Sequence, residues 1–307
     1  MKDLVLFGDC RETLPAFIDE ARMCVTSPPY YGLRDYGGEA SQIGMEQTPE
    51  EYIQQLVEVF RLVRDNLTDD GTLWVNIGDS YYNYRSDGNY PKQTVSKTRQ
   101  DLPTKTPVRG NKLKGLKSKD LIGIPWMLAF ALRADGWYLR QDIIWHKPNP
   151  MPESVKDRCT KAHEYIFLLS KNKNYYYNNE AIKEPAKDWG TRDRSNGKYH
   201  NPGSGLAPHS GLTKSYERKN KRSVWSVTVK PYKGAHFATY PEELVTPCIL
   251  AGSEKGDIVL DPFMGSGTTA MVAKKNSRSY LGCELREEYA SLQTARISSI
   301  PNKLPLY

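Results

Sequence analysis

The segment from Asp257 to Lys275 constrains the fold of this chain more than any other part of its sequence. A short apolar run ends at Asp261, glycines follow at positions 265 and 267, and a helix is predicted from there to Lys275. Glycine in such a turn permits positive φ and a close approach of the backbone to a ligand. A strand, a glycine turn and a helix in this order predict one unit of a doubly wound α/β sheet.

The rest of the sequence repeats this alternation. Thr48, Pro49 and Glu51 predict a helix start, with Thr48 as the cap, Pro49 at the first position and Glu51 completing a capping box. We predict strands at 4–7, 23–26, 71–77, 137–145, 164–169, 257–260 and 279–283, the fourth and fifth as an antiparallel pair. We predict helices at 13–21, 49–67, 121–134, 241–251, 268–275 and 287–297. The pattern therefore indicates a mostly parallel sheet.

Polar residues stand at the ends of several predicted strands: Asp9, Ser27, Asp79, Asp261 and Glu284. In a doubly wound sheet, ligands bind beyond the carboxyl ends of the strands, near the point where the strand order reverses. We therefore expect these five side chains to lie along one rim.

The net charge of +7 is unevenly distributed. Residues 81–119 hold 10 Lys and Arg against 2 acidic residues, and residues 171–233 hold 14 against 5. The remainder of the chain is therefore acidic. Two solvated loops would explain such segments, and so would a surface that binds a polyanion.

The five cysteines are scattered, without a CxxC pair or a histidine cluster, so we expect neither a disulfide framework nor a metal site. No apolar run has the length of a membrane span, and Met1-Lys2-Asp3 does not open a signal peptide. We expect a reduced, cytoplasmic protein without a membrane partner.

The glycine turn resembles two common phosphate-binding motifs only in part. A P-loop needs Gly-Lys-Ser/Thr, which is absent, and a dinucleotide fingerprint needs a third glycine where this chain has Ala270. The longer run Asp261-Pro262-Phe263-Met264-Gly265-Ser266-Gly267-Thr268 is instead similar to motif I of amino DNA methyltransferases that use S-adenosylmethionine.

A second run, Thr26-Ser27-Pro28-Pro29-Tyr30, resembles the catalytic motif of the same family. The catalytic motif comes first and the cofactor motif last, which is the order of the beta class. The resemblance covers residues 4–80, 120–170 and 234–300. It implies a doubly wound, Rossmann-like methyltransferase sheet with basic inserted target-recognition segments.

The resemblance also implies a division of the chain. The catalytic domain would comprise residues 1–80, 120–170 and 234–307. Residues 81–119 and 171–233 match no part of the family, and their positive charge predicts that both contact double-stranded DNA, the first as a basic inserted loop and the second as the target-recognition region.

The resemblance assigns the cofactor, S-adenosyl-L-methionine, to several residues. Asp261 would accept a hydrogen bond from the methionine ammonium, Phe263 would line the adenosine pocket, and Glu284 would bridge the ribose hydroxyls. Asp9 stands where the family often contacts the adenine amino group, although a turn or a helix cap explains it equally well. The segment His236-Phe237 begins a run similar to motif X, which closes over the methionine end.

The catalytic motif suits methylation of an exocyclic amino group on a base flipped out of the duplex. Such a nitrogen is a poor nucleophile, because its lone pair is delocalised into the ring. The Ser27 hydroxyl and the Pro28 carbonyl could accept its hydrogens, and Tyr30 would stack on the base. Pro28 and Pro29 fix φ and offer no N–H, so the carbonyl is preorganised for direct, in-line methyl transfer. No metal is required.

Three further residues have structural interpretations. Pro247-Cys248 resembles the nucleophile of C5-cytosine methyltransferases, but Cys248 lies within an apolar-periodic helix and is interpreted as core. His146 and His163 fall in blocks that match the family, and we favour structural roles for both.

The target atom follows from family correlation alone. Ser-Pro-Pro-Tyr accompanies mainly N4-cytosine, whereas Asp- or Asn-Pro-Pro-Tyr accompanies mainly N6-adenine, so we predict N4-cytosine with N6-adenine as the alternative. Methylation of RNA or of protein glutamine, or DNA binding without catalysis, are remoter alternatives. A cognate restriction enzyme is a candidate partner, and the host would be a bacterial, archaeal or phage-infected cell.

Overall fold

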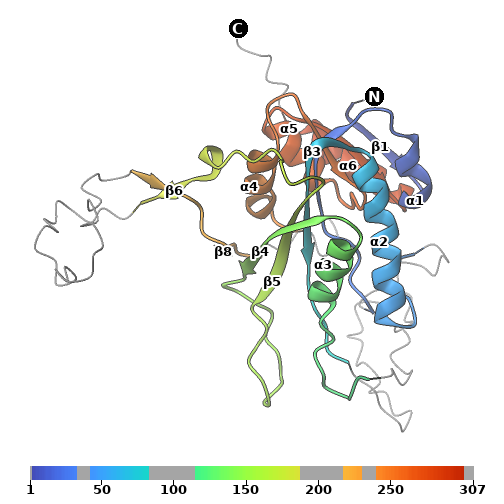
Figure 1. Ribbon diagram of the computed structural model, residues 1–307, viewed down its shortest axis with the longest axis vertical. Coiled ribbons are helices and arrows are strands. Elements are labelled where there is room, and N and C mark those ends of the chain that lie inside the picture. Colours follow the sequence, from blue (N-terminus) through green and yellow to red (C-terminus); the bar gives the residue numbers. More distant parts are fainter. Residues whose placement is uncertain (1, 33–41, 83–114, 187–216, 230–239, 301–307) are drawn as a thin grey trace, which may run out of the picture.

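A computed structural model describes residues 2–32, 42–82, 115–186, 217–229 and 240–300. Eight strands form one sheet in the order β1-β10-β9-β2-β3-β5-β4-β8, with helices on both faces (Figure 1). The strands are β1 (Leu4–Phe7), β2 (Ala21–Thr26), β3 (Leu67–Ile77), β4 (Tyr138–His146), β5 (His163–Ser170), β8 (Val224–Ser226), β9 (Ile258–Asp261) and β10 (Ser279–Glu284). The helices are α1 (Cys10–Thr13), α2 (Pro49–Asp65), α3 (Ile124–Ala134), α4 (Glu242–Gly252), α5 (Thr268–Lys275) and α6 (Ala290–Ser298). Short 3₁₀ turns cover Leu14–Ala16, Glu180–Ile182 and Glu287–Tyr289.

The sheet is parallel from β1 through β3, while β5 runs antiparallel to both β3 and β4. β2 pairs with β9 on one side and with β3 on the other, so the strand order reverses between β9 and β2. The register pairs Phe7 with Glu284 and Gly282 with Asp261, which brings the carboxyl ends of these strands to one edge. The predicted doubly wound architecture is confirmed.

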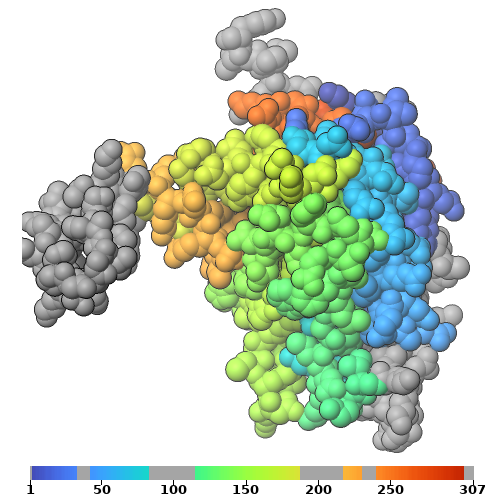
Figure 2. Space-filling view, viewed as in Figure 1, coloured from blue at the N-terminus to red at the C-terminus, as the bar shows by residue number. Residues whose placement is uncertain are grey.

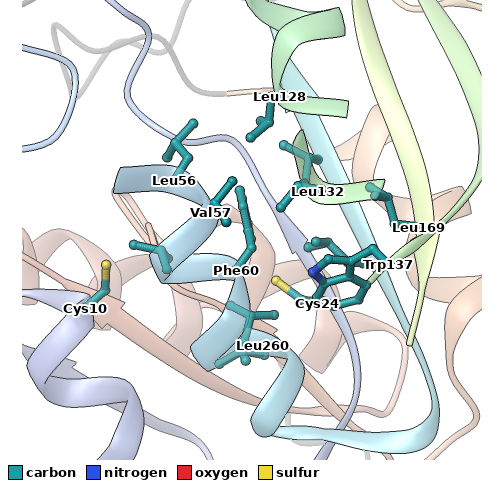
Figure 3. Close-up of a cluster of buried hydrophobic side chains, with 14 of the residues drawn as sticks. Cys10, Cys24, Leu56, Val57, Phe60, Leu128, Leu132, Trp137, Leu169 and Leu260 are labelled. Carbon is teal, nitrogen blue, oxygen red and sulfur yellow. The ribbon is translucent and has the colours of Figure 1, made fainter. Parts of the chain in front are cut away.

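Alternate residues of the central strands enter two cores on opposite faces of the sheet. Cys24 and Leu73 join a cluster under α2 and α3, in which Leu56, Phe60 and Leu132 converge (Figure 3). Met23, Val25 and Trp74 join the second cluster, with side chains of α4 and α5. The period-two alternation of a strand produces this division, and each fully buried apolar side chain contributes about 1.5–3 kcal/mol.

Several local predictions are confirmed. The Thr48 hydroxyl accepts from the Glu51 N–H at 3.2 Å, and the Glu51 carboxylate accepts from the Thr48 N–H at 3.2 Å, which completes the capping box. β4 and β5 form the expected antiparallel pair.

The predicted helix at 13–21 is wrong: α1 ends at Thr13, a 3₁₀ turn follows, and β2 begins at Ala21. Pro15 explains why α1 ends, since its ring would clash with the Arg11 carbonyl in a longer α-helix, and the chain is already extended at Phe17, with ψ of 134°.

The described flanks of the predicted target-recognition region pack onto the main body. Ile182 and Trp225 are 8% and 5% exposed within the second core, and β8 extends the edge of the main sheet beside β4. β6 (Glu184–Pro185) and β7 (Arg218–Lys219) pair as a separate two-stranded stem that stands away from this body (Figures 1 and 2). Most of the predicted inserted loop, residues 83–114, lies outside the described residues.

Among the helices that the structure describes, none has both the length and the apolar character needed to cross a membrane.

Candidate active site at the carboxyl edge of the sheet

The turn after β9 contains two glycines, and their surroundings differ: the backbone at Gly265 is accessible, and the backbone at Gly267 is closely packed. Gly265 and Gly267 have φ of +52° and +80°. Among the described residues, a Cβ added to Gly265 would meet only the Phe263 carbonyl at 3.8 Å, whereas one on Gly267 would press against Gln293 at 3.3 Å. Gln293 of α6 also donates to the Gly265 carbonyl at 2.7 Å. Gln293 of α6 therefore holds the turn on one side, and at Gly265 the backbone is accessible to a bulky ligand.

Glu284 ends β10 beside this turn and is 8% exposed. One carboxylate oxygen accepts from the Gly265 N–H at 2.7 Å, and the other accepts from the Arg286 N–H at 3.0 Å. Burial raises the pKa of the carboxyl group, and the two hydrogen bonds work in the opposite direction. Among the described residues, one group donates to each oxygen, so each keeps a second acceptor position, which suits a pair of vicinal hydroxyl groups.

Asp261 ends β9 and is 1% exposed. One carboxylate oxygen accepts from the Thr26 hydroxyl at 2.6 Å and from the Phe263 N–H at 3.0 Å. The other accepts from the Tyr240 hydroxyl at 3.1 Å and from the Thr269 hydroxyl. Burial raises the pKa of Asp261, opposed by these hydrogen bonds. Its contact with a methionine ammonium stays a prediction, and such a contact would have to displace one of four protein donors.

Asp9 has the structural role that the sequence left open. Its carboxylate accepts from the Arg11 N–H at 2.8 Å as the cap of α1, and it also pairs with the Arg11 guanidinium. Burial favours a higher pKa for Asp9, but the hydrogen bonds from Arg11 outweigh it and lower the pKa. Its contact with an adenine amino group stays a prediction.

The predicted catalytic turn, Ser27-Pro28-Pro29-Tyr30, follows β2 and is anchored at its second proline. The Tyr52 hydroxyl of α2 donates to the Pro29 carbonyl at 2.7 Å. Within the described part of the chain, no group donates a hydrogen bond to the Pro28 carbonyl, so this oxygen is available as the predicted acceptor.

Tyr30 is held by residues from the antiparallel side of the sheet. Its hydroxyl donates to Glu164 of β5 at 2.7 Å, and the Asn76 amide of β3 donates to the same oxygen at 3.3 Å. Lys147 forms an ion pair with Glu164. Burial raises the pKa of Tyr30 well above its usual value, with the charge of Glu164 adding to this and a hydrogen bond with Ser27 opposing it.

Sequence analysis did not identify Tyr52, Asn76 or Glu164 as parts of the site. Glu164 is the last residue of a segment, Arg158 to Glu164, that resembles the family. The sequence does not predict that Glu164 contacts Tyr30. That contact joins residues 134 positions apart, and no local pattern encodes it.

Gly78, which follows β3, also shapes the position of Tyr30. A Cβ at position 78 would lie 2.8 Å from Cε2 of Tyr30 and 3.4 Å from the Glu164 carboxyl carbon. We therefore expect Gly78→Ala to displace the ring, to lower the free energy of unfolding by about 1–3 kcal/mol and to slow methyl transfer about 10- to 100-fold. Thermal melting and single-turnover assays measure the two effects. A variant with wild-type turnover would show that the ring position is unimportant.

The remaining predicted residues fall into three groups. Pro262 and Ser266 lie in the glycine turn with Phe263, and Thr268 begins α5 directly after it; Arg296 of α6 donates to the Ser266 hydroxyl at 2.5 Å. His236 and Phe237 lie outside the described residues. Asp79 reaches the predicted rim, but its carboxylate accepts from the N–H groups of Gly123 and Ile124 and so caps α3.

Cys248 and the two histidines have structural surroundings. Cys248 is 1% exposed within α4 and belongs to the second core, which confirms its interpretation as a core residue. His146 and His163 face each other in the β4–β5 register, and His146 contacts the Ser226 hydroxyl at 3.0 Å.

Comparison with known proteins identifies close relatives. The model of a family described as DNA methylase, comprising N6 and N4 methyltransferases, matches residues 21–295. The type II methyltransferase M.SmaI of Serratia marcescens is 48% identical over 298 residues, covering 95% of this chain and 90% of its own. M.Cfr9I of Citrobacter freundii is 46% identical over 280 residues, covering 90% and 81%.

Solved structures share the fold. The cytosine-N4-specific PvuII DNA methyltransferase has a TM-score of 0.62 at 19% identity, covering 99% of this chain and 88% of its own. A putative DNA modification methylase of Thermus thermophilus, solved in complex with S-adenosyl-L-methionine, has a TM-score of 0.56 at 24% identity, covering 98% and 94%.

Proposed function

The chain belongs to the N6/N4 DNA methylase family, and on that premise we propose that it methylates the N4 amino group of cytosine at a specific site in duplex DNA. The methyl donor of this family is S-adenosyl-L-methionine, whose sulfonium carries an activated methyl group. The observation that carries the proposal is the adjacency of two strand ends: β2 leads into Ser27-Pro28-Pro29-Tyr30, and its neighbour β9 leads into the glycine turn.

The groups at the carboxyl edge of the sheet suit S-adenosyl-L-methionine. Within the part of the chain that the structure describes, Glu284 offers one free acceptor position on each oxygen for the ribose hydroxyls, and Gly265 leaves room for close approach. Phe263, half-buried beside the turn, would line the adenosine pocket. The carboxylates along this edge also suit a ligand that carries a positive sulfonium and an ammonium group.

The catalytic turn supplies positioning and two acceptors. Ser27 and the Pro28 carbonyl would take the hydrogens of the target amino group, which directs the nitrogen lone pair out of the ring plane. Tyr30, fixed by Glu164, would stack on the flipped base. Because the donor methyl is already activated, correct placement of the amino nitrogen provides most of the rate enhancement.

The choice of cytosine rests on Ser27, since serine before Pro-Pro-Tyr accompanies mainly N4-cytosine in the family that the sequence resembles. The PvuII enzyme that shares the fold is cytosine-N4-specific by name. The 46–48% identical relatives are named type II methyltransferases, which supports a modification enzyme paired with a restriction enzyme. The relatives M.SmaI and M.Cfr9I come from bacteria, and a DNA substrate would suit the cytoplasm of a bacterial, archaeal or phage-infected cell.

Mass spectrometry of nucleosides tests the target atom. DNA from cells that express the chain is digested to nucleosides, and we expect N4-methylcytosine at a level that rises with expression. DNA from the same cells with an empty vector is the control. N6-methyladenine without N4-methylcytosine would overturn the choice of base and leave the family assignment intact.

A further inference from the structure

The carboxylate of Asp261 joins four separate parts of the chain. Its donors are the last residue of β2 (Thr26), the backbone of its own turn (Phe263), the segment before α4 (Tyr240) and the first turn of α5 (Thr269). These four donors match the roughly four acceptor positions of a carboxylate. Because Asp261 is 1% exposed, its charge depends on these groups rather than on water.

Thr26 alone among these donors belongs to the catalytic side of the site. It is fully buried and directly precedes Ser27. The ladder between β2 and β9 has its last pair at Cys24 and Leu260, so the Thr26–Asp261 hydrogen bond of 2.6 Å lies beyond that pair, where the two strands begin to separate. A short hydrogen bond to an ionised acceptor is among the stronger contacts in a protein.

We propose that Thr26 is a positioning residue, which acts through Asp261 to set the distance between the catalytic turn and the cofactor turn. This inference rests on the proposed function. In the proposed function Ser27 would face the target amino group and Gly265 the methyl donor, and the Thr26–Asp261 hydrogen bond is a direct side-chain link between the strands that carry them. Methyl transfer needs the two reactants in near-attack geometry, and a displacement of about 1 Å costs about 100-fold in rate.

The chain offers matched variants for a test. Thr26→Val keeps the shape of the side chain and removes the donor, whereas Thr26→Ser keeps the donor. Thr269→Val removes a different donor from the same carboxylate; its hydroxyl also approaches the Val25 carbonyl of β2, but only at 3.5 Å, the outer limit of a hydrogen bond. A merely structural role would make the two valine variants similar in every measurement.

The experiment measures the single-turnover methylation rate, the calorimetric Kd for S-adenosylmethionine and the melting temperature. We expect Thr26→Val to lower the rate about 100-fold with Kd within about 3-fold of wild type. We expect Thr26→Ser to restore the rate to within about 3-fold, and Thr269→Val to lower the melting temperature with a much smaller loss of rate.

Three results would overturn the inference: a Thr26→Val enzyme with wild-type rate, an equal loss of rate in Thr269→Val, or no recovery in a folded Thr26→Ser enzyme. If the melting curve shows that Thr26→Val is unfolded, Thr26→Ala replaces it with the same expectation. Wild-type protein that binds the cofactor but methylates no DNA would refute the proposed function, and the positioning role with it. If wild type and Thr26→Val both methylate DNA at the same rate, only the positioning role is refuted.

Discussion

Ser27→Ala is expected to lower the single-turnover methylation rate about 10²- to 10³-fold, the usual cost of removing one preorganised group that stabilises a transition state. Ser27 follows β2 beside the Pro28 carbonyl, and together they are the acceptors proposed for the target amino group. With one acceptor missing, the amino lone pair would stay delocalised in the ring. Rapid-quench assays with excess enzyme measure the rate of this step directly.

The cofactor affinity of Ser27→Ala should remain near that of wild type, because the groups proposed to hold the cofactor follow β1, β9 and β10 or precede α4, and none belongs to the turn after β2. Ser298→Ala is a suitable control: its exposed hydroxyl lies at the end of α6 and donates only within that helix, to the Ala295 carbonyl at 3.3 Å. A Ser27→Ala enzyme that turned over normally, or that lost cofactor binding instead of turnover, would contradict the proposed role.

Removal of residues 187–216 is expected to abolish site-specific methylation while the protein remains folded. The ends of this deletion are chosen from the β6–β7 stem. There the Ala186 N–H donates to the Glu217 carbonyl at 2.9 Å, so the two residues on either side of the deletion already lie side by side. An Asn-Gly turn can therefore join the two strands as a hairpin. Deletion of the whole predicted region, 171–233, would instead remove Ile182, Trp225 and strand β8 from the main body.

Methylome sequencing of cells that express the shortened chain measures this effect. Specific sites are commonly preferred over other DNA by about 10³-fold or more, so their modification should fall to background. A full-length control in which Lys and Arg of 187–216 become Gln should weaken DNA binding and reduce its salt dependence, because fewer counterions are released. A shortened chain that still modified the same sites would place recognition elsewhere in the protein.

Features encoded within a few residues were predictable. The capping box of α2, the extent of α5 and the antiparallel pairing of β4 with β5 follow from capping residues, periodicity and spacing. The error at residues 13–21 also has a local cause, since Pro15 ends the helix that begins earlier, at Cys10, and the chain is extended from Phe17. The burial of Cys248 also followed from the helical spacing of its apolar neighbours.

The sequence by itself determined the alternation of strands and helices, the two motifs and their placement at strand ends. Parallel strands bring their carboxyl ends to one edge whatever their order, so the position of the site needed no further information. Only the tertiary structure decided which strands are neighbours, and hence which side chains meet. Asp261 meets Thr26 across 235 residues, and Tyr30 meets Glu164 across 134, because the sheet order places β9 beside β2 and β5 beside β3. Such contacts depend on the packing of the whole sheet, which no local propensity specifies.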